Sequence, residues 1–190
     1  MKKYTFIFLI TIFADFSSLF AQGFQPPSDG KAVIYFVRVS NRVGGPKLSV
    51  DYFQQDKFIG EVKGANYMRV ECAPGKHLFW ATIENKEFMT ADLKAGATYI
   101  VIVDIFPGGW NARVGFSPLA VTDKELFERA KKIVNENAPV VTPEKRIEEK
   151  NKKLKGTIEK SLKMYEEEWK NTKPFKSILP DMNIPDETLK

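Results

Sequence analysis

The chain has 190 residues, a formal net charge of +5 and 43% hydrophobic residues. This apolar content suffices for one packed domain and excludes a globally disordered chain. Lysine and arginine are mixed with acidic residues along most of the chain, so no basic stripe predicts nucleic-acid binding.

Residues 1–21 have the three parts of a secretory signal peptide. Lys2 and Lys3 form a basic start, Tyr4–Ala14 is an apolar run, and Ala21 is a small residue before the expected cut. The run is too short to span a bilayer. We therefore expect export to the periplasm, cell envelope or extracellular space. An uncleaved anchor is the alternative, and after cleavage no further membrane contact is expected.

A β-domain is predicted to follow a short linker. Residues 22–30 include Pro26, Pro27 and Gly30, which disfavour regular structure. Residues 31–119 alternate β-branched and aromatic runs with turn residues, a pattern typical of an antiparallel β-sandwich or a small barrel, and we favour the sandwich. Seven or eight strands are expected, at 32–39, 48–54, 57–63, 67–72, 77–84, 88–93, 98–106 and 110–116.

A tight turn in the middle of this domain raises the question of catalysis. Pro74 and Gly75 predict a hairpin that would place Cys72 and His77 on neighbouring strands. A thiolate beside an imidazole is the arrangement of a nucleophilic site. A single cysteine is more often a small buried hydrophobe, and no oxyanion-binding element or orienting group is evident. We expect no catalytic residues.

Helices are predicted in residues 121–171. Thr122 as N-cap and Glu125 three residues later indicate the start of a first helix. Thr142 followed by Pro143 indicates the start of a second, which should reach the end of this extension. The first helix has one apolar face, expected to pack on the β-domain and formed by Leu126, Phe127, Ala130, Ile133 and Val134.

The second helix carries a narrow apolar stripe that ends in Tyr165 and Trp169. This stripe has two interpretations, as a cover for the β-domain or as a contact surface for another protein or a second copy. Cover is favoured, because most amphipathic helices in compact proteins pack inward. Residues 172–190 contain three prolines and are expected to form an extended tail.

Exposed aromatic side chains are the other candidate binding feature. Side chains alternate between faces along a strand, so Phe79 and Trp80 point to opposite faces and one of them can reach the outer face of the sandwich. A solvent-facing Trp80 or Trp110 would form a platform for a glycan or peptide. With Tyr165 and Trp169 these are the candidate ligand- or partner-binding residues. No motif predicts a metal site or a cofactor.

Four segments of the β-domain carry a resemblance. They are YFVR at 35–38, FIGEVKGANY at 58–67, APGKH at 73–77 and KAGATYIV at 94–101. In these segments the chain resembles a family of short bacterial envelope domains of unknown function, and their style is also that of PEGA-like and prealbumin-like surface modules. The resemblance covers under half of the chain and implies an extracytoplasmic β-sandwich with no known catalytic residues.

These observations favour an exported, non-enzymatic β-sandwich with a binding or structural role in the cell envelope, and with an envelope protein or a glycan as partner. The alternative is a glycan- or peptidoglycan-binding accessory protein or, with less support, an envelope hydrolase. A concave cluster of polar side chains at the hairpin ends would favour the alternative. A flat surface with one apolar patch would favour the module.

Overall fold

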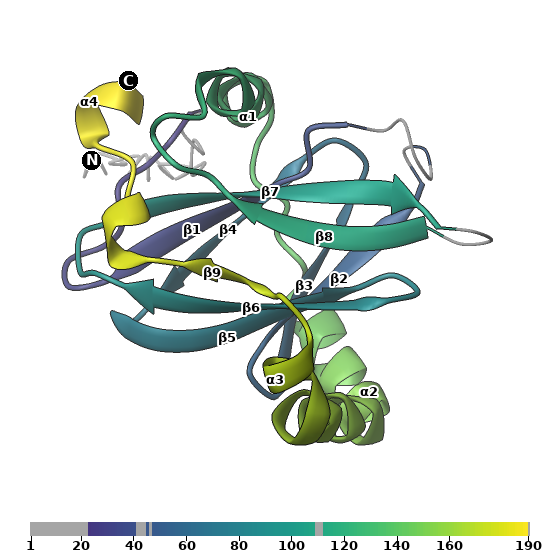
Figure 1. The fold of residues 1–190 in the computed structure, drawn as a ribbon. Helices are drawn as coiled ribbons and strands as arrows, with labels where there is room; N and C mark the ends of the chain where they lie inside the picture. Colours follow the sequence, from purple (N-terminus) through teal and green to yellow (C-terminus); the bar gives the residue numbers. More distant parts are fainter. Residues whose placement is uncertain (1–22, 41–44, 46, 109–111, 190) are drawn as a thin grey trace, which may run out of the picture.

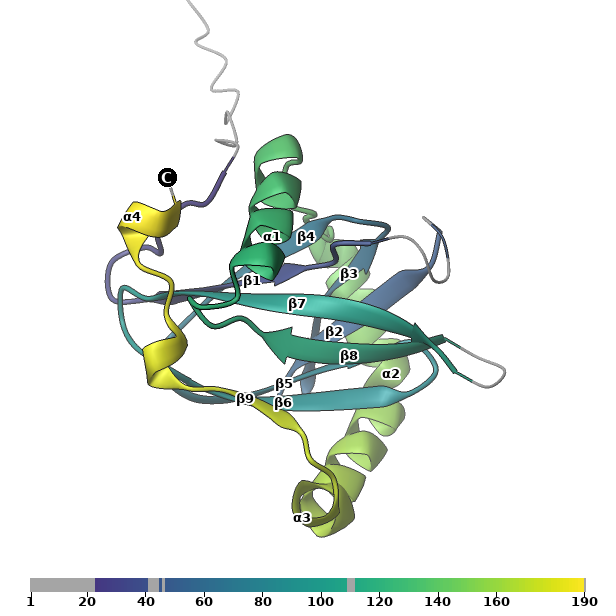
Figure 2. The same cartoon turned by 45° about the horizontal axis from the view of Figure 1, so that its top comes forward.

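The computed structural model describes residues 23–40, 45, 47–108 and 112–189. The expected signal peptide and Trp110 lie outside this part of the chain. Two sheets stack on each other, with a helix against each outer face (Figures 1 and 2). A mainly β fold with a helical extension is therefore confirmed.

The first sheet has the strand order β4-β1-β7-β8, and the second has the order β3-β2-β5-β6-β9. The strands are β1 (Ala32–Val37), β2 (Ser49–Gln54), β3 (Lys57–Lys63), β4 (Tyr67–Cys72), β5 (Gly75–Thr82), β6 (Lys86–Leu93), β7 (Thr98–Pro107), β8 (Ala112–Pro118) and β9 (Lys176–Ile178). The helical elements are α1 (Lys124–Glu136), α2 (Glu144–Met164), the π-helix η1 (Tyr165–Trp169), α3 (Lys170–Thr172), the short 3-10 helix η2 (Pro180–Met182) and α4 (Asp186–Leu189).

The sheets are mixed rather than purely antiparallel. β1 pairs with β7 in parallel, and β6 pairs with β9 in parallel. β1 and the first six residues of β7 are fully buried, which explains why these two apolar strands lie side by side in the centre of their sheet. The bulk of the core lies between the sheets, where Phe36, Tyr52 and Phe116 meet.

The prediction of a hairpin around Pro74 and Gly75 is wrong. β4 belongs to the first sheet and β5 to the second, so this turn carries the chain across the sandwich. Gly75 takes a φ of 108°, which allows the sharp bend. The sequence indicates the bend correctly, but turn chemistry does not decide which strands then pair.

Each outer face is covered by one helix. The expected apolar face of α1 packs on the first sheet, where Phe127, Ala130 and Val134 are buried against β1 and β7. On the other side, α2 and η1 cover the second sheet through Ile158 and Tyr165. Thr142 does not cap α2, because the helix begins at Glu144 with Pro143 in the N-cap position; the Thr142 hydroxyl instead accepts a hydrogen bond from the Glu61 amide of β3.

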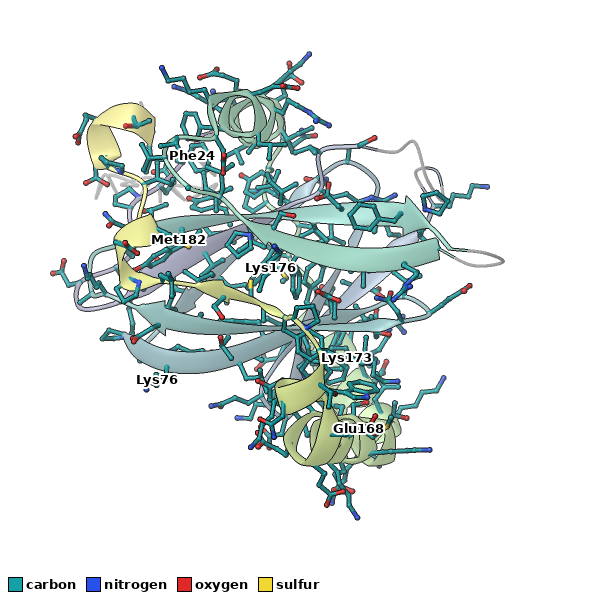
Figure 3. The ribbon with its side chains drawn as sticks, viewed as in Figure 1. Phe24, Lys76, Glu168, Lys173, Lys176 and Met182 are labelled. Carbon is teal, nitrogen blue, oxygen red and sulfur yellow. The ribbon has the colours of Figure 1, made fainter. Side chains whose placement is uncertain are left out.

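The tail and the N-terminal segment both pack on the sandwich. The tail runs from α3 along β6 and on toward the first sheet (yellow in Figure 1), burying Ile178 between the sheets and Ile184 beneath α1. At the other end of the chain, Phe24 lies between α1 and the first sheet (Figure 3), with its ring 4.8 Å from that of Tyr35. The segment predicted as a linker thus contributes to packing.

Candidate binding site beside strand β4

Three of the four aromatic candidates, Trp80, Tyr165 and Trp169, lie in one cluster beneath the second helix. Trp80 is 1% exposed and stacks on Phe53 at 3.7 Å, while its indole N–H donates to the Gln55 carbonyl at 3.0 Å. Tyr165 is 8% exposed, and its ring stacks 4.7 Å from that of Phe88. Neither Trp80 nor Tyr165 therefore offers an open ring face to a ligand.

Trp169 closes the end of this cluster. Its ring meets Phe88 edge-on at 6.0 Å, and the Lys173 ammonium lies 3.5 Å from the ring centroid. Lys173 directly follows α3 in the chain (labelled in Figure 3). Tyr165 and Trp169 are four residues apart, so they share one face of the helix and both contact Phe88. The stripe therefore packs on the second sheet, which is the first of its two interpretations, a cover for the β-domain.

Cys72 and His77 do not form a nucleophile and base pair. Burial raises the pKa of the Cys72 thiol to about 11, so the reactive thiolate is disfavoured. Both nitrogens of His77 have other partners: Nε2 lies 2.8 Å from the Ala73 carbonyl oxygen, and Nδ1 lies 3.0 Å from the Gln54 amide nitrogen. The Gln54 amide donates to Nδ1, so Nε2 is the nitrogen that donates to the Ala73 carbonyl.

The described part of the chain has neither a metal-binding cluster nor a membrane-spanning helix. Among residues 23–40, 45, 47–108 and 112–189, no three histidine, cysteine, aspartate or glutamate side chains are grouped so that they could hold a metal ion. No helix in the same residues is both long and apolar enough to cross a bilayer.

Two exposed sheet edges are closed by asparagine side chains. On β3, the Asn151 amide accepts from the Phe58 N–H at 2.8 Å and donates to the Phe58 carbonyl at 3.0 Å. On β8, Asn85 does the same for Val114, at 2.7 and 2.8 Å. Each asparagine occupies main-chain groups that would otherwise invite another strand.

The edge of β4 is closed at one end, and at its other end the main chains of Arg69 and Glu71 have no partner among the described residues. In the connection between α1 and α2, the Val140 N–H donates to the Tyr67 carbonyl at 2.9 Å. Alternate residues of a strand direct their main-chain groups to the same edge, so those of Arg69 and Glu71 share the direction of the Tyr67 carbonyl. The hydrogen bond from the Arg38 N–H to the Asn66 carbonyl supports this direction. It shows that the main-chain groups of even-numbered residues point toward β1, so those of odd-numbered residues point to the outer edge.

A hollow of about 470 Å³ opens beside this free edge. Its walls come from the N-terminal segment and from the connection between the helices, and its floor is β4. We call it the β4 hollow; it is lined by Gly23, Gln25, Pro26, Pro27, Ser28, Tyr67, Arg69, Glu71, Pro139, Val140 and Val141. Val141 is 68% exposed, so an apolar side chain stands at the rim.

An ordered polar network lines the floor of the hollow. The Arg69 guanidinium donates to Glu71 at 2.6 Å, to the Pro26 carbonyl at 2.8 Å and to the Tyr35 hydroxyl at 3.2 Å. The Ser28 amide and hydroxyl donate to the same Glu71 carboxylate, at 3.1 and 2.8 Å. Within the described residues, the Nη1 group of Arg69 has no partner.

Both members of this ion pair stay charged near neutral pH. Partial burial opposes ionisation of Glu71, but the hydrogen bonds from Arg69 and Ser28 outweigh it, and the pKa of the carboxyl lies below its ordinary value. Burial likewise opposes the charge on Arg69, but its hydrogen bonds to Glu71 and Tyr35 raise its pKa further. The hollow therefore combines a fixed charge pair with apolar walls.

A second, smaller hollow of about 380 Å³ lies on the outer face of the other sheet, beyond the end of the helical cover. It is lined mainly by polar side chains, and the Thr90 and Ser177 hydroxyls lie 2.7 Å apart there. Lys76 and Asp92, which face each other across β5 and β6, border it.

No family model, curated protein or solved structure matches the chain. The β4 hollow could not be predicted from the sequence, because its walls come from segments about 40 and 70 residues away from its floor. The pattern of Arg69 and Glu71 on one face of a strand was the available signal, and by itself it is common on exposed strands.

Proposed function

We propose that the protein is an exported, non-enzymatic binding module of the bacterial cell envelope that holds a partner in the β4 hollow. The observation that carries this proposal is the meeting of an unpaired strand edge, apolar walls and a charge pair at one place. Export rests on the N-terminal sequence. The buried Cys72 and the fully engaged His77 favour binding over catalysis.

The test is affinity capture with the mature protein, from Gln22 onward, in an envelope extract of the source cell. Val141→Glu places a charge at the rim of the hollow and should remove the captured partner. Val121→Glu is the matched control, since Val121 is also an exposed apolar residue, at 44%, and does not line the hollow. A partner retained equally by both variants would refute the β4 hollow as the site.

The smaller hollow supports a second candidate, a glycan-binding accessory role. Its hydroxyl, ammonium and carboxylate groups are of the kind that hydrogen-bond sugars, and Leu78 adds an apolar surface. Co-sedimentation with purified peptidoglycan tests this role, with Thr90→Val as the variant that removes one hydroxyl. Pelleting that Thr90→Val reduces and Val141→Glu leaves unchanged would place glycan binding there.

A further inference from the structure

We infer that the occupant of the β4 hollow is an extended peptide segment of a partner protein, which adds to the first sheet as a strand antiparallel to β4. This inference rests on the proposed function, because it assumes that the hollow is where a partner binds. It adds the recognition mode and the charge pattern of the segment.

The main chain provides the first argument. The amides and carbonyls of Arg69 and Glu71 face the open part of the edge, while Val140 occupies the Tyr67 carbonyl at its closed end and Asn151 and Asn85 occupy main-chain groups at other edges. Unpaired donors and acceptors in a row bind another extended backbone. An antiparallel segment would form two hydrogen-bonded residue pairs here, one with Arg69 and one with Glu71.

The side chains provide the second argument, through charge complementarity. Those of Arg69 and Glu71 line the hollow, so the residues opposite them in an added strand lie in it as well. An acidic residue opposite Arg69 can accept from the free Nη1 group, and a basic residue suits Glu71. In the antiparallel direction this selects a segment with a basic residue two positions before an acidic one.

The shape of the hollow provides the third argument. Tyr67 is already paired with Val140, and β4 ends at Cys72, so the open edge is short. Pro26, Pro139 and Val141 stand beside it as apolar walls. A volume of about 470 Å³ suits a few side chains and not a folded domain.

Synthetic peptides test this mode without altering the protein. The probe is acetyl-Val-Lys-Val-Glu-Val-amide, whose lysine and glutamate amides would donate to β4. N-methylation of those two amides should weaken binding about tenfold or more, because it removes both donors. N-methylation of the central and last valine amides should leave binding nearly unchanged, because those amides face away. Isothermal titration calorimetry measures the affinities, and hydrogen exchange should show new protection of the Arg69 and Glu71 amides.

The inference is overturned if the probe does not bind at millimolar concentration, or if both methylated peptides bind equally. It is also overturned if sedimentation shows a dimer of the chain and hydrogen exchange shows that the same amides are protected in that dimer without peptide. Capture from the envelope extract that depends on Val141, together with a failed peptide test, would retain the proposed function and reject strand addition. Loss of both would reject the function as well.

Discussion

The two outer faces of the sandwich are covered in different ways. On the first sheet, the 13-residue α1 packs through one aromatic ring, Phe127, and small aliphatic side chains. On the second sheet, the helix from Glu144 to Thr172 lies on a continuous aromatic stack that includes Phe53, Trp80 and Phe88.

This difference explains where the binding site lies. The longer helix and its aromatic stack cover part of the second sheet, and the smaller hollow lies beyond the end of this cover. The shorter α1 lies on β1 and β7 and leaves the edge strand β4 to the N-terminal segment and the connection between the helices. Those two irregular segments leave a space between them above β4, and this space is the β4 hollow.

The largest expected effect is on the aromatic face. Trp80→Ala should lower the free energy of unfolding by about 4–5 kcal/mol, because the indole is fully buried and stacked on two rings. Phe127→Ala should cost about 3 kcal/mol, since Phe127 is 6% exposed and meets one other ring, Phe24, at 6.3 Å. Urea unfolding of the two variants measures the difference. An equal or larger cost for Phe127→Ala would contradict the unequal weight of the two faces.

The edge asparagines should come next. Asn151→Ala removes both bonds to the Phe58 main chain and should cost about 1–3 kcal/mol, because a part-buried donor and acceptor lose their partner. Asn151→Asp is the matched variant: it keeps the acceptor for the Phe58 N–H but turns a carboxylate oxygen toward the Phe58 carbonyl, so the loss of stability should remain. If Asn151→Ala leaves urea unfolding unchanged, the amide is not a structural cap of β3.

Trp169→Ala sharpens the choice between cover and contact surface. The half-buried ring contacts Phe88 and Lys173, so its loss should cost about 1–2 kcal/mol of stability. Capture of the envelope partner should remain unchanged, since the ring already has these neighbours. Loss of the partner at wild-type stability, measured by thermal unfolding, would instead make the helix a contact surface.

Much of the fold could be predicted from periodicity. The central positions of β1 and β7 follow from their nearly continuous apolar runs, and the inward face of α1 follows from its helical spacing. The crossing at Pro74 and the pairing of β9 with β6 could not be predicted, because local sequence indicates a bend or an extended segment but not its distant partner. The strand from Lys176 to Ile178 was expected to be extended tail.

The binding site was harder to predict than the fold. Strand alternation predicts that either Phe79 or Trp80 reaches the outer face. The structure has Trp80 there, but the helix stripe that ends in Trp169 covers it. The aromatic residue of the strand and the apolar stripe of the helix could each be predicted from local sequence, but that they bury each other could not. The β4 hollow depends on which main-chain groups stay unpaired, and a residue pattern does not indicate this.

The smallest expected effect is a pH dependence of opposite sign at two glutamates. Glu71 has a pKa below its ordinary value in the folded protein, so it contributes stability above the unfolded pKa of about 4.3, and this is lost as the pH falls through the folded value. Glu71→Gln should therefore be less stable than the wild type at pH 7 and nearly equal to it near pH 3.

Glu87 should behave in the reverse sense. Burial raises its pKa more than the charges of Arg113, Lys173 and Lys176 lower it, so stability falls as the pH rises from about 4.3 through the folded value. Glu87→Gln should then gain stability relative to the wild type at pH 7 and lose that advantage in acid. Urea unfolding from pH 3 to pH 7 separates the two variants. If the free energy of unfolding depends on pH in the same way in both variants, the hydrogen-bond network of Glu71 stabilises the protein no more than an unpaired carboxylate would. That network would then not hold the floor of the β4 hollow rigid.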